Sequence, residues 1–380
     1  MNIHLSSDES QALLDRLTTR LRRYVEHESP TGDSARLDSL GAIIADDFRA
    51  LGATAETHPS DTGNHWTISV PGAGTRADEL PLLFLAHHDT VWPVGRLAEA
   101  PVIIEDGWFH GPGSYDMKGG IVALLEAIAI AQQSSTDRRP LRVLLVADEE
   151  IGSPTARHLV EAQRGAVYAA IGLEPPHPGG GIKTSRWGST RIRLSVTGRE
   201  AHAALDPASG VSAIDELVDQ LVWLRSQVEG VDGMLCNVGS ITGGTRANVV
   251  PGRASAEIGL RFTSAAVEAE LLPKLLSPSP VRAGAIVVAE LLSNRPCWEA
   301  SDVAAELIGA VERASEAVGI TFSHGPAAGA ADTNITGSLG IPSIDGLGPD
   351  GRGAHAPNEA ILVASLGQRA RLLAEIWHLA

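Results

Sequence analysis

The chain has 380 residues, of which 43% are apolar and 40 are glycine, a composition that suits two packed domains and excludes a disordered or fibrous protein. Its formal net charge of −16 argues against a nucleic-acid partner, because nucleic acid is bound by basic patches. No apolar run is long enough to span a membrane, and residues 1–9 lack the charged and apolar regions of a signal peptide, so we expect a cytoplasmic protein with no membrane partner.

The first part of the chain alternates helices with strands. Apolar residues at helical spacing predict helices over residues 7–27 and 37–51, with a break at 29–33. Strand-like runs and one apolar helix follow, namely strands at 66–70, 82–86, 141–146 and 167–173 and the helix at 119–132. Strands that alternate with helices predict an α/β domain with a largely parallel sheet.

The pattern changes after the three glycines at 179–181. A strand over 191–197, a helix over 211–228 and a strand over 254–262 predict a smaller α+β unit. The α/β pattern then returns, because residues 301–318 and 362–379 again have the spacing of helices.

These changes predict an insertion of one domain into another. We expect the first domain to comprise residues 1–182 and 297–380, and the inserted domain to comprise residues 183–296. The first domain would have the parallel sheet, and the inserted domain would have the α+β pattern.

Two adjacent carboxylates, Glu149 and Glu150, follow the apolar run 143–146. Carboxylates at the mouth of a buried strand are costly to desolvate, so a purely structural role is unfavourable. Neighbouring residues of an extended chain point to opposite sides, so one Glu can bind a metal while the other faces the water that attacks the substrate. A solvated acidic turn is the alternative for an isolated pair.

Other histidines and carboxylates also stand where predicted elements end. In an open α/β sheet, binding residues cluster beyond the carboxyl ends of the strands. We therefore expect five side chains to converge, namely His87, Asp116, Glu150, Glu174 and His355. Two imidazoles and three carboxylates match two zinc ions that share one carboxylate. Asp89 lies two residues after His87 on the same face of the strand, so it can orient the imidazole.

Four motifs, in this order along the chain, resemble those of a known family, at residues 87–91, 113–120, 148–153 and 198–203. The family is that of the dizinc metallopeptidases and deacylases, which includes glutamate carboxypeptidase, acetylornithine deacetylase, succinyl-diaminopimelate desuccinylase and aminoacylase. The resemblance covers nearly the whole chain and is strongest to the glutamate carboxypeptidase branch. It implies a zinc-hydrolase catalytic domain with an inserted dimerisation, or lid, domain.

The resemblance also implies a role for each ligand. His87 and Glu174 would hold one zinc ion, Glu150 and His355 would hold the other, and Asp116 would bridge the two. Cobalt or manganese can replace zinc in such a site, because nitrogen and oxygen ligands accept all three metals.

Three further features of the catalytic domain follow from the resemblance. Asp89 would support His87, and Glu149 would be the general base that takes a proton from water and returns it to the leaving amine. The peptide bond between Asp116 and Met117 would be cis.

The inserted domain has a second set of candidates. The resemblance implies that His202 of a partner subunit stabilises the oxyanion and that Asn248 helps at the same place, which requires a homodimer. Arg261 would bind a substrate carboxylate, although Gly259 stands where the family usually has an Asp. Arg295 is a further candidate for substrate binding, and the alternative is that it has a purely structural role.

A leucine stripe in the inserted domain leaves two possibilities open. Leu217, Leu221 and Leu224 repeat at helical spacing within residues 211–228. The stripe either contributes to a dimer interface or belongs to the buried core of the domain.

The predicted function is zinc-dependent hydrolysis of an amide bond in a small N-acyl amino acid or short peptide with a free carboxylate. Glu rather than Asp at position 174 is associated in the family with carboxypeptidases and deacylases, which favours release of a C-terminal amino acid, with glutamate as the candidate. The alternative is an N-acyl-amino-acid deacylase of the acetylornithine deacetylase or aminoacylase type. A metal-stabilised binding protein is disfavoured, because it would have no use for Glu149.

Overall fold

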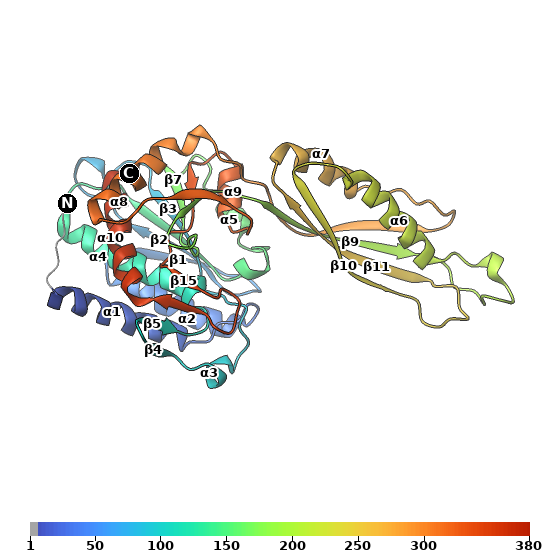
Figure 1. The fold of residues 1–380 in the computed structure, drawn as a ribbon, viewed down its shortest axis with the longest axis horizontal. Coiled ribbons are helices and arrows are strands. Elements are labelled where there is room, and N and C mark those ends of the chain that lie inside the picture. The colour runs from blue at the N-terminus through green and yellow to red at the C-terminus, as the bar shows by residue number, and fades with distance from the viewer. Residues whose placement is uncertain (1–6) are drawn as a thin grey trace. The chain divides into compact units, whose positions relative to one another are not determined.

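The computed structural model describes residues 7–380. Residues 1–6 lie outside the described residues, and they belong to the segment in which we expect no signal peptide. The chain forms two compact units. Unit 1 comprises the residues up to 185 together with 300–327 and 331–380, and unit 2 comprises 186–299 and 328–330. Figure 1 shows the helices and strands of both units.

Unit 1 is built on a six-stranded sheet with the order β1-β2-β6-β3-β7-β14. The strands are β1 (Thr54–His58), β2 (His65–Val70), β3 (Leu82–His87), β6 (Leu141–Val146), β7 (Ala169–Gly172) and β14 (Ser343–Ile344). β1, β2 and β6 pair antiparallel, whereas β6, β3, β7 and β14 pair parallel. The predicted α/β class with a mostly parallel central sheet is confirmed.

Both faces of this sheet are covered, because β3 is buried along its whole length. Leu82 and Phe84 pack into the larger core, and Leu83 and Leu85 pack into a smaller one on the opposite face. The larger core includes residues of α1 (Ser7–Val25), α2 (Ser34–Arg49), α4 (Gly119–Ser134), α8 (Ala305–Val318) and α10 (Val363–Leu379), and the smaller core includes residues of α5 (Arg157–Glu161) and α9 (Thr333–Ser338). None of the helices among the described residues is long and apolar enough to cross a membrane.

Smaller strands bring distant segments of unit 1 together. A four-stranded sheet has the order β15-β16-β5-β4, and β13 pairs with β8. These elements and a short helix are β4 (Ile103–Glu105), β5 (Trp108–His110), β15 (Gly351–Arg352), β16 (Ala360–Leu362), β8 (Ile182–Arg186), β13 (His324–Ala327) and α3 (Arg96–Glu99). Because β16 pairs with β5, the segment that contains His355 lies against the segment that leads to Asp116.

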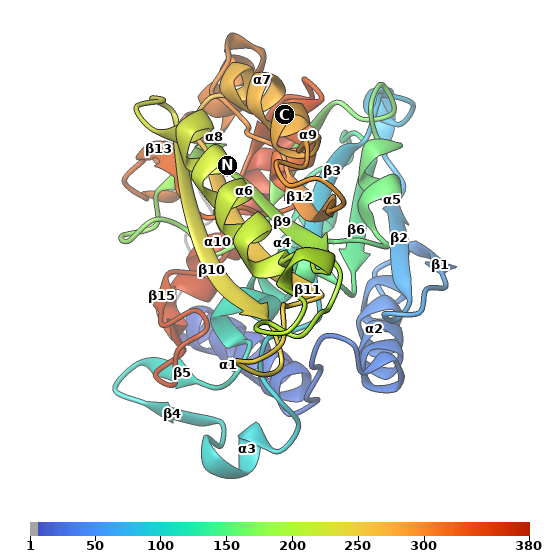
Figure 2. The ribbon, with the colours of Figure 1, turned by 90° about the vertical axis from the view of Figure 1, so that its right-hand side faces the viewer.

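Unit 2 is a four-stranded antiparallel sheet, in the order β10-β11-β9-β12, with two helices on one face (Figure 2). Its elements are β9 (Gly188–Thr197), α6 (Ala213–Val228), β10 (Met234–Gly243), β11 (Arg253–Phe262), α7 (Ala265–Leu275) and β12 (Ile286–Arg295). Alternate residues of β9 and β11 face the helices and form the core of this unit. The other face of the sheet carries mostly polar and charged side chains, together with the exposed Leu235, Ile286 and Val288.

Several predicted ranges need correction. The helix predicted from residue 37 begins at Ser34, because the side chain of Asp33 caps it by accepting the backbone N–H of Arg36. The helix predicted from residue 301 begins at Ala305, after a short helical turn. The leucine stripe of α6 is core, because Leu217, Leu221 and Leu224 are at most 8% exposed, so it gives no support to an interface.

Candidate metal centre

His87 lies at the end of β3 and is 1% exposed. Its Nδ1 is 3.0 Å from the carbonyl oxygen and 3.3 Å from Oδ1 of Asp89. Both are acceptors, so Nδ1 is the protonated nitrogen that donates and Nε2 is left to bind a metal. Nε2 is 3.1 Å from Oδ1 of Asp116 and 3.6 Å from Oε1 of Glu174.

Asp116 lies in the turn Ser114–Lys118 that precedes α4, and its peptide bond to Met117 is cis, as the resemblance implies. Its Oδ1 faces His87, and its Oδ2 is 3.3 Å from Nε2 of His355. The two oxygens of one carboxylate thus face two different imidazoles. This is the arrangement that a carboxylate shared by two metal ions requires.

Glu150 and His355 complete the cluster. Oε2 of Glu150 is 3.1 Å from Nε2 of His355, while its Oε1 is buried and has no hydrogen-bond partner in the part of the chain that the structure describes. His355 has a φ of 60°, a left-handed conformation that is uncommon for a residue with a side chain. Hydrogen bonds to Asp116 and Glu150 raise the pKa of His355 to about 10, so this environment favours a positive charge.

The donor set fits zinc. Two groups of ligand atoms lie within 4.8 Å of one another, one formed by His87, Asp116 and Glu150 and the other by His87, Glu149 and Glu174. Tetrahedral zinc with nitrogen and oxygen ligands separates those ligands by about 3.4 Å. Four imidazole–carboxylate separations in the cluster, from 3.1 to 3.6 Å, agree with this value. The structure therefore brings together all five side chains expected to converge.

Asp89 is completely buried, and it holds other groups in place besides His87. Its two oxygens accept the backbone N–H groups of Glu149 and Glu150, each at 3.2 Å, and Oδ2 also accepts the hydroxyl of Thr31 at 2.8 Å. Burial works against the charged form, but the hydrogen bond from His87 holds the pKa of Asp89 below its ordinary value. One carboxylate thus fixes an imidazole and the Glu149–Glu150 pair.

Two other buried histidines surround the centre but belong to neither ligand group. The ring of His88 packs inside unit 1, with Nε2 donating to the carbonyl of Leu37 at 3.1 Å, and burial lowers its pKa to about 4. Nδ1 of His65 accepts the backbone N–H of Ala147 at 3.1 Å, and Nε2 lies 2.8 Å from the hydroxyl of Thr155. His65 thus holds the start of the turn that presents Glu149.

The sequence did not single out His65 or the buried Glu359. Neither residue stands at the end of a predicted strand, and neither was part of the predicted ligand set. Glu359 does lie only four residues after His355, and that proximity was the one signal available.

In unit 2, His202 and Asn248 lie on two loops that pair with each other. Ala203 donates its backbone N–H to the carbonyl of Asn248 at 3.0 Å, and His202 forms a β-bridge with Val249. Nδ1 of His202 accepts the backbone N–H groups of Ala204 and Leu205. Because Nδ1 accepts, Nε2 is the ring nitrogen that can donate a hydrogen bond, and the residue is exposed.

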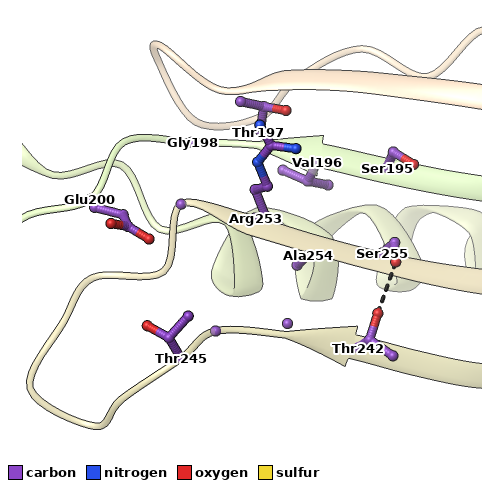
Figure 3. A pocket seen from close by; sticks show the side chains of 13 residues that line it. Ser195, Val196, Thr197, Gly198, Glu200, Thr242, Thr245, Arg253, Ala254 and Ser255 are labelled. Atoms are coloured by element: carbon purple, nitrogen blue, oxygen red, sulfur yellow. Dashed lines mark hydrogen bonds between the residues drawn. The ribbon is translucent and has the colours of Figure 1, made fainter.

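These loops lead into a cavity of about 610 Å³ at the ends of β9, β10 and β11 (Figure 3). It is lined mainly by small and hydroxyl-bearing residues, and the hydroxyls of Thr242 and Ser255 are 2.9 Å apart. Arg253 extends toward Thr197 on the neighbouring strand. None of the catalytic or metal-ligand candidates lines this cavity, although it is larger than the space beside His87.

The two substrate-binding candidates of unit 2 flank one serine. Ser189 of β9 pairs with Arg261 of β11 on one side and with Arg295 of β12 on the other. Nη1 of Arg261 is 2.5 Å from Oγ of Ser189, which supports the guanidinium in place of the missing Asp at Gly259. Arg191, two residues further along β9, points to the same face. These three arginines thus lie near one another on the polar face of the sheet.

The comparisons with known proteins agree with this geometry. The model of the family described as Peptidase family M20/M25/M40 matches residues 83–378. The chain belongs to this family. It is therefore a hydrolase of the peptidase or deacylase type, in a family of metal-dependent enzymes.

Individual relatives span nearly the whole chain. Carboxypeptidase G2 from Pseudomonas sp. (strain RS-16) is 24% identical over 386 residues, which cover 98% of this chain and 90% of that protein. Succinyl-diaminopimelate desuccinylase from Psychromonas ingrahamii is 28% identical over 334 residues, which cover 81% and 84%. The crystal structure of aminopeptidase PepT from Bacillus cereus has a TM-score of 0.74 at 21% identity and covers 96% of this chain and 98% of that one. At that identity it shows the fold alone.

Proposed function

We propose that the protein is a dizinc metallocarboxypeptidase, or amidohydrolase, that releases a C-terminal amino acid from an acyl or peptidyl group. The observation that carries this proposal is the position of Asp116, whose two oxygens face the imidazoles of His87 and His355. One zinc ion would be held by His87 and Glu174 and the other by Glu150 and His355. Bound zinc supplies Lewis-acid activation of the carbonyl group and of the attacking water.

The protein's own residues would move the proton and stabilise the developing charge. Glu149, 8% exposed and in one ligand group with His87, would accept a proton from the attacking water and deliver it to the leaving amine nitrogen. The backbone N–H of Glu149 is held by Asp89, so the base would be fixed relative to the metal ligands. The Nε2–H of His202 would donate to the carbonyl oxygen as negative charge develops on it.

The arginines of unit 2 would bind the free carboxylate of the substrate. A guanidinium presents a planar pair of N–H donors that matches a carboxylate. Arg261 is exposed and oriented by Ser189, and Arg295 lies across the same serine. Two guanidinium groups on one sheet face favour an anionic substrate over a neutral one, with glutamate as the candidate amino acid released.

The alternative is an N-acyl-amino-acid deacylase, which breaks the same kind of bond but recognises the acyl half differently. The likeness to carboxypeptidase G2 over 98% of the chain favours the first reading, and the likeness to a desuccinylase favours the second. The metal centre and the base would serve both reactions, so the substrate pocket decides between them.

Unit 2 would serve as the dimerisation domain. The outward face of α6 exposes Val218 and Val222, which are 53% and 62% exposed. β10 is an edge strand next to that helix, and edge strands offer unpaired backbone groups to a second strand. Leu205 is 84% exposed in the His202 loop, as expected for a loop that is covered by a partner subunit. A homodimer would place His202 in the site of the partner.

A substrate screen with zinc-loaded protein tests the proposal. N-blocked peptides with a free C-terminus are compared with the same peptides carrying a C-terminal amide, and with N-acetyl and N-succinyl amino acids. Release of the C-terminal amino acid from only the free-carboxylate peptides supports the carboxypeptidase, and hydrolysis of only the small acyl amino acids supports the deacylase. Preference for peptides with a free amine and an amidated C-terminus would contradict both.

A further inference from the structure

A single buried carboxylate, that of Glu359, accepts four N–H groups, and its residue is 4% exposed. Its Oε1 accepts the backbone N–H groups of Tyr115 and Asp116, at 2.9 and 3.1 Å. Its Oε2 accepts the backbone N–H of Gly113 at 2.8 Å and the indole N–H of Trp92 at 2.6 Å. All four partners are donors, so they require a side chain with two oxygens that act only as acceptors.

These donors belong to the segments that carry the metal-ligand candidates. Asp116 is itself one of the donors, and Trp92 lies five residues after His87. Glu359 lies four residues after His355, in the connection between β15 and β16. One carboxylate therefore joins the three segments that present His87, Asp116 and His355.

The position of Asp116 makes this junction important for the metal centre. Its carboxylate must present one oxygen to His87 and the other to His355, at 3.1 and 3.3 Å. A shift of its backbone by about 0.5 Å would spoil such a two-sided arrangement. The hydrogen bond from its own N–H to Glu359 fixes that backbone, and the bonds from Gly113 and Tyr115 fix the turn around it.

We propose that Glu359 is a positioning residue of the metal centre, which holds Asp116 in the place where it can bridge two ions. This inference rests on the proposed function, because it needs a metal at the cluster. Glu359 does not itself contact the ions or the substrate. A purely structural role would affect folding, whereas the proposed role also sets the affinity of the folded protein for metal.

Unit 2 offers a matched control, Glu216. This residue is buried as well, with 0% exposure, and its carboxylate accepts the backbone N–H groups of Val281 and Arg282 at 2.9 and 2.7 Å. It joins two segments of unit 2, neither of which carries a metal-ligand candidate. Glu216→Gln therefore perturbs the same chemistry at a place where metal binding should not respond.

The experiment is a zinc titration of metal-free protein against a chelating indicator at pH 8. The four N–H donors around Glu359 require the carboxylate form, and pH 8 lies well above the ordinary pKa of a glutamate side chain. Glu359→Gln keeps the size of the side chain but directs an NH2 group at two of the four donors. We expect zinc affinity to fall by about 10- to 100-fold in Glu359→Gln, and to stay within about twofold in Glu216→Gln.

Trp92→Phe is a second variant that tests the same inference if Glu359→Gln does not fold. It removes only the indole donor and keeps a ring in place, and we expect zinc affinity to fall by a few-fold. Unchanged affinity in both Trp92→Phe and folded Glu359→Gln, beside normal zinc binding by the wild type, would overturn this inference alone. An equal loss in Glu216→Gln would also overturn it. A wild type that binds no zinc would overturn the proposed function as well.

Discussion

The two units hold their candidate residues in opposite ways. In unit 1, His87 and Asp89 are at most 1% exposed, and a single carboxylate anchors both the imidazole and the Glu149–Glu150 pair. In unit 2, His202 and Asn248 are exposed on paired loops. Buried charges are tolerated only when an opposite charge compensates them, so the cluster of carboxylates in unit 1 fits the metal centre proposed above.

His202 and Asn248 are not held in a buried network of the kind that surrounds His87 and Asp89. Nδ1 of His202 accepts two backbone N–H groups of its own loop, and the residue is exposed. A donor of this kind gains catalytic value only when water is excluded around it, because electrostatic stabilisation is weak in bulk solvent. The comparison therefore predicts that changes in unit 1 act within one chain, whereas changes at His202 act through a second chain.

The largest effect is expected for Glu149→Gln. Loss of the proton acceptor should lower turnover by about two to four orders of magnitude, while zinc content persists because glutamine keeps the size and the backbone contacts of the side chain. Glu150→Gln is the contrasting variant, and it should lose zinc from one of the two positions. Elemental analysis and steady-state rates on the same samples separate the two outcomes. If the Glu149→Gln protein retained most of the wild-type rate, Glu149 would not be the general base.

His202→Ala should lower turnover by about two to three orders of magnitude, the effect of removing one oxyanion donor. Mixing it with Glu149→Gln chains tests whether His202 acts across subunits. About half of the dimers are then mixed, and each of these has one site with Glu149 from one chain and His202 from the other. About a quarter of wild-type activity should therefore return. No recovery after proven subunit exchange would mean that His202 serves its own chain.

A smaller effect is expected for Arg261→Lys. The ammonium group loses the planar pair of donors, and a hydrogen bond to a charged group contributes about 1.5–3 kcal/mol, so KM should rise by about tenfold or more while kcat changes less. Arg253→Lys is the matched control, because Arg253 lies on the same strand and faces the same side of the sheet. Equal KM changes in the two variants would remove Arg261 from carboxylate binding.

The convergence of the metal-ligand candidates was predictable because most of them follow strands or precede a helix, and parallel strands bring their carboxyl ends to one edge of a sheet. Glu359 and His65 were not predictable, because their partners lie far away in the sequence. These partners are backbone N–H groups and the side chains of Trp92 and Thr155, and only the tertiary structure brings them together. The edge strands β10 and β12 were missed for a related reason. Each has an irregularity in its pairing, near Ser240 and Ser293 respectively, and many of their residues are exposed, so alternation is weak.

The smallest expected effect concerns His65. We expect this residue to make the free energy of unfolding of unit 1 depend on pH. Burial lowers the pKa of His65 from its ordinary value of 6.5, against the opposing charges of Asp148, Asp332 and Asp89. The neutral form is required, because Nδ1 accepts the N–H of Ala147. The unfolded chain therefore binds a proton that the folded chain does not, and stability is lost as the pH falls through and below 6.5.

His65→Asn keeps an acceptor near Ala147 but cannot titrate, so its stability should depend less on pH in this range. The measurement is the urea midpoint of both proteins between pH 8 and pH 5, in the presence of a chelator so that metal binding does not contribute. The wild type should lose its advantage over the variant as the pH falls, because only the wild type must keep a buried imidazole neutral. Parallel curves would show that His65 does not contribute to the acid sensitivity of unit 1, and would leave its role to the geometry of the Glu149 turn.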